Sequence, residues 1–115
     1  MTARRRSRAG SPAPGVEEID GLDELADALL SLRTKDEYRR FLRDLCTIAE
    51  LEALAHRWRI VMLLDQDLPY LEVAQLVPTS TATVTRVAHW LHHGTGGYST
   101  ALDRTRPQRG SKSVR

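Results

Sequence analysis

The fold is decided by residues 70–91, YLEVAQLVPTSTATVTRVAHWL. Its apolar residues have helical spacing on both sides of the break at Pro78, which predicts helices over residues 70–77 and 80–92. Two short helices joined by a tight turn are typical of a helix-turn-helix, in which a small residue is needed where the helices cross. Ala74 meets that need. The apolar residues expected to flank the crossing are Val73, Val77, Val84 and Val87.

The expected outer face of the second helix is rich in hydroxyl groups and poor in charge. Arg86 is the one charged residue between Val77 and Leu91. Short hydroxyls and one arginine suit a helix that enters a DNA major groove about 12 Å wide. The alternative interpretation is a plain helical hairpin with a threonine-rich surface. The candidate DNA-contacting residues are Ser80, Thr81, Ala82, Thr83, Thr85, Arg86 and His89.

Pro78 stands where a helix-turn-helix commonly has glycine. Proline fixes φ near −65°, so this turn cannot use the left-handed geometry that glycine permits. The residue before a proline is also restricted, and we expect Val77 to leave the helical region. The turn must therefore be built in another way.

The rest of the chain also has helical periodicity. Apolar spacing predicts helices over residues 22–33, 35–46 and 48–65, and a last short helix near 99–105. Capping boxes mark two of the starts, Thr34 with Glu37 and Thr47 with Glu50. A length of 115 residues indicates one domain, placed at residues 16–105. We therefore predict an all-α helical bundle containing a helix-turn-helix.

The charge is divided along the chain. Residues 1–15 and 104–115 contain 9 of the 17 basic residues and no acid, whereas residues 16–103 hold 8 basic and all 15 acidic residues. Residues 1–15 and 106–115 also lack an apolar period, which predicts disordered basic tails. Such tails either contact phosphate or only aid solubility, and composition alone favours neither.

Several classes of protein and site are not expected. The sequence has no apolar run of about 18 residues, so no membrane span is expected. The lone Cys46 excludes an internal disulfide and suits a reducing cytoplasm. His89 and His93 could ligate a metal from one helix face, but no nearby acid or thiol supplies further ligands. We therefore interpret them as an exposed helix end. No nucleophile, base and orienting acid come together, so no enzyme is predicted.

Two motifs resemble the tryptophan-repressor superfamily: HRWRIVMLL at residues 56–64 and TATVTR at 81–86. Two longer stretches are similar to its Trp-repressor-related YerC/YecD branch. They are FLRDLCTIAELEALAHR at residues 41–57 and STATVTRVAHWLHHGTGGY at 80–98. The resemblance covers roughly residues 35–105. It implies a homodimeric regulator that binds double-stranded DNA in the cytoplasm, at the nucleoid.

The same resemblance implies a possible effector pocket at Arg57, Thr83 and Arg86. A glycine and a serine of the tryptophan site are replaced here by Val87 and Trp90. Val87 would fill space that the ligand needs, and Trp90 could occupy the slot itself, so a tryptophan corepressor is not expected. The favoured hypothesis is a sequence-specific DNA-binding transcriptional regulator. The alternatives are a helical protein-interaction module and a small-molecule sensor that does not bind DNA.

Overall fold

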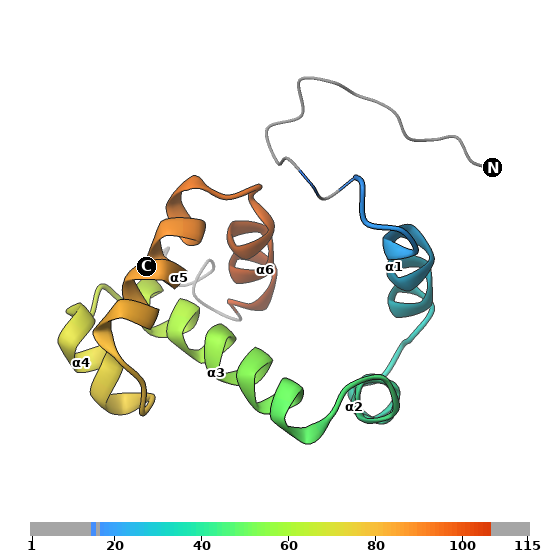
Figure 1. The fold of residues 1–115 in the computed structure, drawn as a ribbon, viewed down its shortest axis with the longest axis horizontal. Coiled ribbons are helices and arrows are strands. Elements are labelled where there is room, and N and C mark those ends of the chain that lie inside the picture. The colour runs from blue at the N-terminus through green and yellow to red at the C-terminus, as the bar shows by residue number, and fades with distance from the viewer. Residues whose placement is uncertain (1–14, 16, 107–115) are drawn as a thin grey trace. The chain divides into compact units, whose positions relative to one another are not determined.

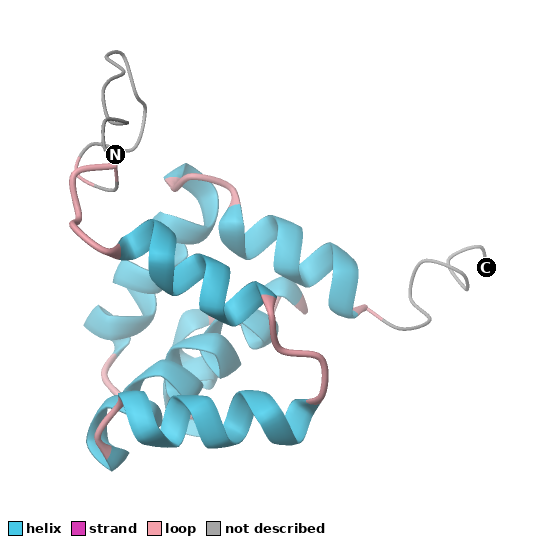
Figure 2. Ribbon diagram, turned by 90° about the vertical axis from the view of Figure 1, so that its right-hand side faces the viewer, coloured by secondary structure: helices cyan, strands magenta, loops and turns pink. Residues whose placement is uncertain are grey.

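Helices account for all regular secondary structure in the part of the chain that the structure describes. The computed structural model describes Gly15 and residues 17–106, and Figures 1 and 2 show helices joined by short loops, with no strand over these residues. The prediction of an all-α fold is confirmed. The basic tails, apart from Gly15 and Arg106, lie outside the described residues. The elements are α1 (Leu22–Leu30), α2 (Lys35–Leu45), α3 (Ile48–Asp65), α4 (Tyr70–Leu76), α5 (Thr81–His93) and α6 (Gly97–Thr105).

The chain divides into two units within α3, one ending at Glu52 and the other beginning at Ala53. The first unit contains α1, α2 and the start of α3. The second contains the rest of α3 together with α4, α5 and α6. Across the described residues, no helix combines the length and apolar character needed to cross a membrane.

Side-chain caps set the starts of α2 and α3. The Glu37 N–H donates to Thr34 Oγ1 at 3.1 Å, and the Thr34 N–H donates to Glu37 Oε1 at 3.4 Å. Thr47 and Glu50 exchange the same two bonds at 2.8 and 3.0 Å. Both predicted capping boxes are confirmed, and each satisfies two N–H groups that a helix start leaves unpaired.

The first helix ends earlier than its apolar spacing predicts. We expected it to reach residue 33, but α1 ends at Leu30, where the Ser31 hydroxyl donates to the Ala28 carbonyl at 2.6 Å. The Arg33 N–H donates to Glu37 Oε1 at 2.7 Å. Residues 31–34 therefore end α1 and begin α2 through these hydrogen bonds. Apolar spacing does not predict such bonds, so it placed the end of α1 too late.

The buried core lies in the second unit. Its fully buried side chains are Ile60, Val61, Val73, Val77 and Val84, and partly buried hydrophobic residues, Trp58 and Tyr98 among them, pack against this cluster. Full burial of one such aliphatic side chain contributes ~1.5–3 kcal/mol. These residues come from α3, α4, α5 and the turn after α4, so the core fixes the helix-turn-helix on α3. In contrast, no residue of α1 or α2 is buried.

Candidate nucleic-acid interface

The crossing of α4 and α5 is built from small and branched apolar side chains. The two helices pack directly on each other. Ala74 is 7% exposed, while Val73, Val77 and Val84 are 0% exposed. Because alanine carries only a methyl group at the contact, α5 can approach the backbone of α4 closely. The residues expected at the crossing are all buried, Val87 included, and α4 is thereby fixed as the support of α5.

The turn at Pro78 uses no left-handed residue. Val77 closes α4 with φ −114° and ψ 99°, in the extended region that a following proline imposes. The Thr79 N–H donates to the Ala74 carbonyl at 3.2 Å, spanning the proline, which has no N–H to donate. No residue from 77 to 80 has a positive φ. The prediction that this turn does not use the left-handed glycine geometry is confirmed. The hydrogen bond from Thr79 to Ala74, from residue i to i−5, closes the turn instead.

Ser80 caps the start of α5. Its hydroxyl accepts the Thr83 N–H at 3.1 Å and lies 3.1 Å from the Thr83 hydroxyl. Thr83 is half-buried, whereas Ser80 is exposed. Both side chains were expected to contact DNA, and the structure gives both a role in the helix start. That role competes with DNA contact for the same oxygen atoms.

The outer face of α5 is exposed along its full length. Thr81, Thr85 and His89 are exposed and four residues apart, so they form one row on the helix. Ala82 and Arg86 form a second exposed row that continues to Trp90, which is 56% exposed. The opposite side carries the buried residues Val84, Val87 and Ala88. All the candidate residues except the half-buried Thr83 therefore lie on an open surface.

The electrostatics of this surface favour an anionic partner. Residues 80–93 contain no carboxylate, and within the described residues Arg86 forms no hydrogen bond or ion pair. Residues 53–106 carry five basic and four acidic side chains, a balance of +1. Residues 17–52 carry five basic and eleven acidic side chains, a balance of −6. The acidity of the central region therefore belongs to the first unit and not to the one that contains α5.

The Trp repressor protein family matches residues 20–106 of the chain, which include every helix of the structure. The chain belongs to the Trp repressor family. It is 39% identical over 93 residues to the uncharacterized protein YerC of Bacillus subtilis, an alignment that covers 79% of this chain and 89% of the relative. The predicted YerC branch is thereby confirmed.

Two solved structures have the same fold. A TrpR-like protein from Eubacterium eligens is 34% identical with a TM-score of 0.71, over 76% of this chain and 90% of that one. A Trp repressor candidate from Staphylococcus aureus is 38% identical with a TM-score of 0.69, over 73% of this chain and 84% of that one. The Trp repressor family is one of regulators and not of enzymes, so the prediction that the chain is no enzyme is confirmed.

The three residues expected to form an effector pocket have different surroundings in this Trp repressor family chain. Arg57 and Arg86 are exposed, and Thr83 is bonded to Ser80. Trp90 does not fill an internal slot, contrary to our expectation. Its ring lies edge-on to His89, with the centroids 4.9 Å apart, and remains largely exposed. Its spacing of four residues from Arg86 is the sequence signal that could have placed Trp90 on the outer face.

A second polar feature lies where α3, α5 and α6 meet. Leu64, Asp65, Leu91, His92 and Arg106 are among the residues that line a cavity of about 280 Å³. It contains none of the three residues expected to bind an effector. It also contains none of the candidate DNA-contacting residues, so the cavity is separate from that face of α5.

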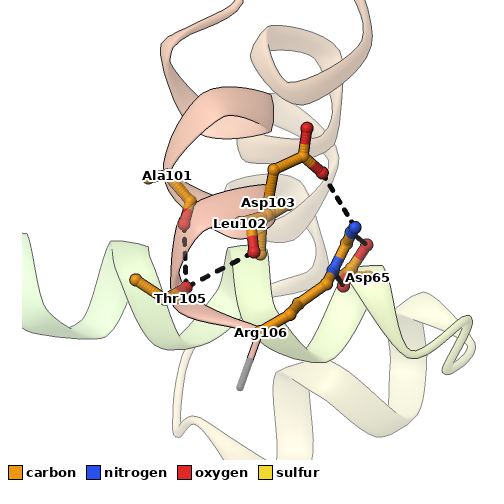
Figure 3. A network of polar contacts seen from close by, with 6 residues as sticks. All are labelled: Asp65, Ala101, Leu102, Asp103, Thr105 and Arg106. Atoms are coloured by element: carbon orange, nitrogen blue, oxygen red, sulfur yellow. Dashed lines mark hydrogen bonds and ion pairs between the residues drawn. The ribbon is translucent and has the colours of Figure 1, made fainter. Parts of the chain in front are cut away.

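Arg106 clamps the end of α6 to the end of α3 (Figure 3). Its Nη2 and Nε contact the two carboxylate oxygens of Asp65 at 2.6 and 3.2 Å, and its Nη1 contacts Asp103 at 2.9 Å. The hydrogen bond to Asp65 is the main cause that raises the pKa of Arg106 above its ordinary value. We expected Arg106 to begin the disordered tail. The structure instead makes it the last anchored residue of the helical part.

Proposed function

We propose that this Trp repressor family protein is a sequence-specific DNA-binding transcriptional regulator that acts in the cytoplasm. The carrying observation is the two-sided character of α5, whose inner side is buried and whose outer side is exposed and free of carboxylates. A single helix is the element that the DNA major groove admits. In this proposal α4 braces α5, and Thr81, Thr85, Arg86 and His89 approach the base edges.

The proposed active form is a homodimer. No residue of α1 or α2 is buried, although α2 has a strongly apolar side. Ile48 and Leu54 of α3 are 51% and 46% exposed. Apolar side chains left exposed on amphipathic helices, as these are, favour a partner that covers them. A symmetric pair of chains would present two copies of α5 to half-sites one DNA turn, ~34 Å, apart.

The test compares Arg86→Ala with Arg104→Ala. Both changes remove one exposed arginine, but Arg104 lies on α6. A site is first selected from random DNA, and dissociation constants are then measured by fluorescence anisotropy for that site and for unrelated DNA. If Arg86 contacts a guanine, its loss should weaken binding to the selected site by ~1–3 kcal/mol, about 5- to 150-fold.

The control variant and the unrelated DNA distinguish a base contact from a phosphate contact and from no contact. Arg104→Ala should leave the affinity for the selected site nearly unchanged. An equal loss on every DNA sequence would assign Arg86 to a phosphate contact. If Arg86→Ala changes nothing, α5 is not the DNA-contacting helix and the proposal fails.

We further infer that DNA binding needs no tryptophan. Val87 is 5% exposed and its side chain belongs to the core, so it cannot withdraw to make room for an indole. Adding L-tryptophan should therefore leave the DNA dissociation constant and the melting temperature of the protein unchanged. A rise in either the DNA affinity or the melting temperature would contradict this inference and support tryptophan as a corepressor.

The alternative, a protein-interaction module, is favoured by one observation. Tyr70, Leu71 and Leu76 on α4 are 41%, 63% and 48% exposed, which is a large apolar area for a helix so short. Selection from random DNA also separates the two functions. Failure to enrich any sequence at low salt would favour the interaction module, whereas enrichment of a palindrome would favour the regulator.

A further inference from the structure

Three histidines stand within five residues at the end of α5, in the sequence HWLHH at residues 89–93. All three are exposed. The ring centroids of His89 and His93 are 5.0 Å apart, and those of His92 and His93 are 6.5 Å apart. His92 also lines the cavity beside Arg106. His89 and His93 are therefore the histidine pair with the shorter centroid distance, and their rings are tilted by 42°.

The separation of these two rings matches that of two histidines bound to one metal ion. A histidine nitrogen binds zinc at about 2.0–2.1 Å. Two rings that share a tetrahedral ion then have centroids about 5 Å apart. Helical spacing of i and i+4 is also the arrangement by which two histidines of one helix bind a single zinc ion. The spacing of the pair therefore permits a shared ion once one nitrogen of each ring turns toward it.

Trp90 supports one of the two ligands. Its ring meets His89 edge-on, with centroids 4.9 Å apart and an interplanar angle of 85°. A ring held by a neighbour loses less conformational freedom when it binds an ion. Gly94 is the C-cap that follows His93, and glycine suits this position because a side chain there would collide with the Trp90 carbonyl. The two histidines thus lie near the C-terminal end of α5.

We propose that His89 and His93 form an open site for a divalent late transition metal, binding Cu²⁺ more tightly than Zn²⁺. Within the described residues, the end of α5 included, no group of three or more histidine, cysteine, aspartate or glutamate residues is placed to hold a metal ion, so the protein offers only this pair. Water therefore completes the coordination. A closed structural zinc site takes four protein ligands and an open catalytic one takes three, so a site of two histidines holds its ion more weakly than either. Nitrogen ligands and the order of divalent affinities favour Cu²⁺ and disfavour Mg²⁺.

The site is tested on the full chain in the absence of DNA, so its failure and that of the proposed function are distinguishable. Isothermal titration with Cu²⁺ should give one ion per chain. His89→Ala and His93→Ala should each weaken binding about tenfold or more, and the double variant should remove this phase. Zn²⁺ should bind more weakly than Cu²⁺, and Mg²⁺ should give no heat.

His92→Ala is the matched control, because it removes an adjacent exposed histidine from the same helix turn. Its Cu²⁺ affinity should stay within about twofold of that of the unchanged protein. A loss in His92→Ala as large as in His93→Ala would overturn the pairing. Binding that persists in the double variant would overturn the site itself. Circular dichroism establishes that each variant is folded.

Fluorescence gives a second and independent readout. Cu²⁺ quenches a nearby indole, and Trp90 contacts His89, whereas Trp58 packs against the core. Saturable quenching should therefore be present in the unchanged chain and absent in Trp90→Phe. Quenching that is equal in Trp90→Phe and in the unchanged protein would place the ion elsewhere.

Discussion

Ser80 illustrates how one side chain can be assigned two roles. Its hydroxyl accepts the Thr83 N–H and so satisfies a donor at the start of α5. The same hydroxyl is exposed at the end of the helix that we place in the groove. A capping role predicts a loss of stability on mutation, whereas a DNA contact predicts a loss of affinity. Two substitutions separate these effects.

Ser80→Ala removes the cap, and we expect the free energy of unfolding to fall by ~1 kcal/mol. Ser80→Asp keeps a good capping group and should retain most of the stability, because a carboxylate also suits a helix N-terminus. Its negative charge should nevertheless weaken DNA binding through repulsion by phosphate. Urea unfolding and anisotropy measure the two quantities. Unchanged DNA affinity in Ser80→Asp would show that the start of α5 does not approach DNA.

At the scale of elements, α3 has two different halves. Its C-terminal half supplies the buried residues Ile60 and Val61 to the core. Its N-terminal half exposes Ile48 and Leu54, although both belong to the apolar stripe that predicted the helix. Apolar periodicity fixes which side of a helix avoids water, but not whether the same chain covers that side. The exposed half of α3 is therefore where a second chain is expected.

Leu54→Glu tests this expectation. A charge at a desolvated interface is costly, so we expect sedimentation velocity to show a dimer for the unchanged protein and a shift toward monomer for the variant. Leu71→Glu is the matched control, because Leu71 is also an exposed leucine but lies on α4. If Leu71→Glu dissociates the dimer and Leu54→Glu does not, the interface lies on α4.

The sequence predicted what depends on local spacing and missed what depends on distant partners. Ala74 and Val84 could be placed at the crossing because helical periodicity and residue size decide burial there. Arg106 could not, because its partner Asp65 is 41 residues away in the chain. Trp90 was a candidate to fill the tryptophan slot because the family resemblance places it where that site has a serine. The structure leaves it on the surface at the edge of the α5 face.

At the scale of the whole molecule, charge is divided into three kinds of region. Residues 17–52 are acidic, residues 53–106 are nearly neutral, and residues 1–14 and 107–115 contain seven basic residues and no acid. The unit that contains α5 thus brings little net charge of its own toward DNA. We therefore expect the tails to supply much of the nonspecific attraction to phosphate.

Deleting residues 1–14 and 107–115 should flatten the dependence of log K on log salt by about 0.9 for each phosphate contact that is lost. The truncation keeps Arg106, so the clamp to Asp65 remains and the melting temperature should hold. A parallel deletion of 106–115 removes the clamp and should lower the melting temperature. An unchanged salt slope in the first truncation would show that the helical part alone attracts the phosphates.

The proline turn has a consequence for the cost of association. Pro78 restricts its own backbone and that of Val77 even before folding, so less conformational entropy is lost when the turn forms. Once folded, the turn is held by the bond from Thr79 to Ala74 and by the burial of Val77. A stiff joint gives α4 and α5 a single relative orientation. The paired helices can then dock as a rigid body, without a further entropic penalty for freezing their angle.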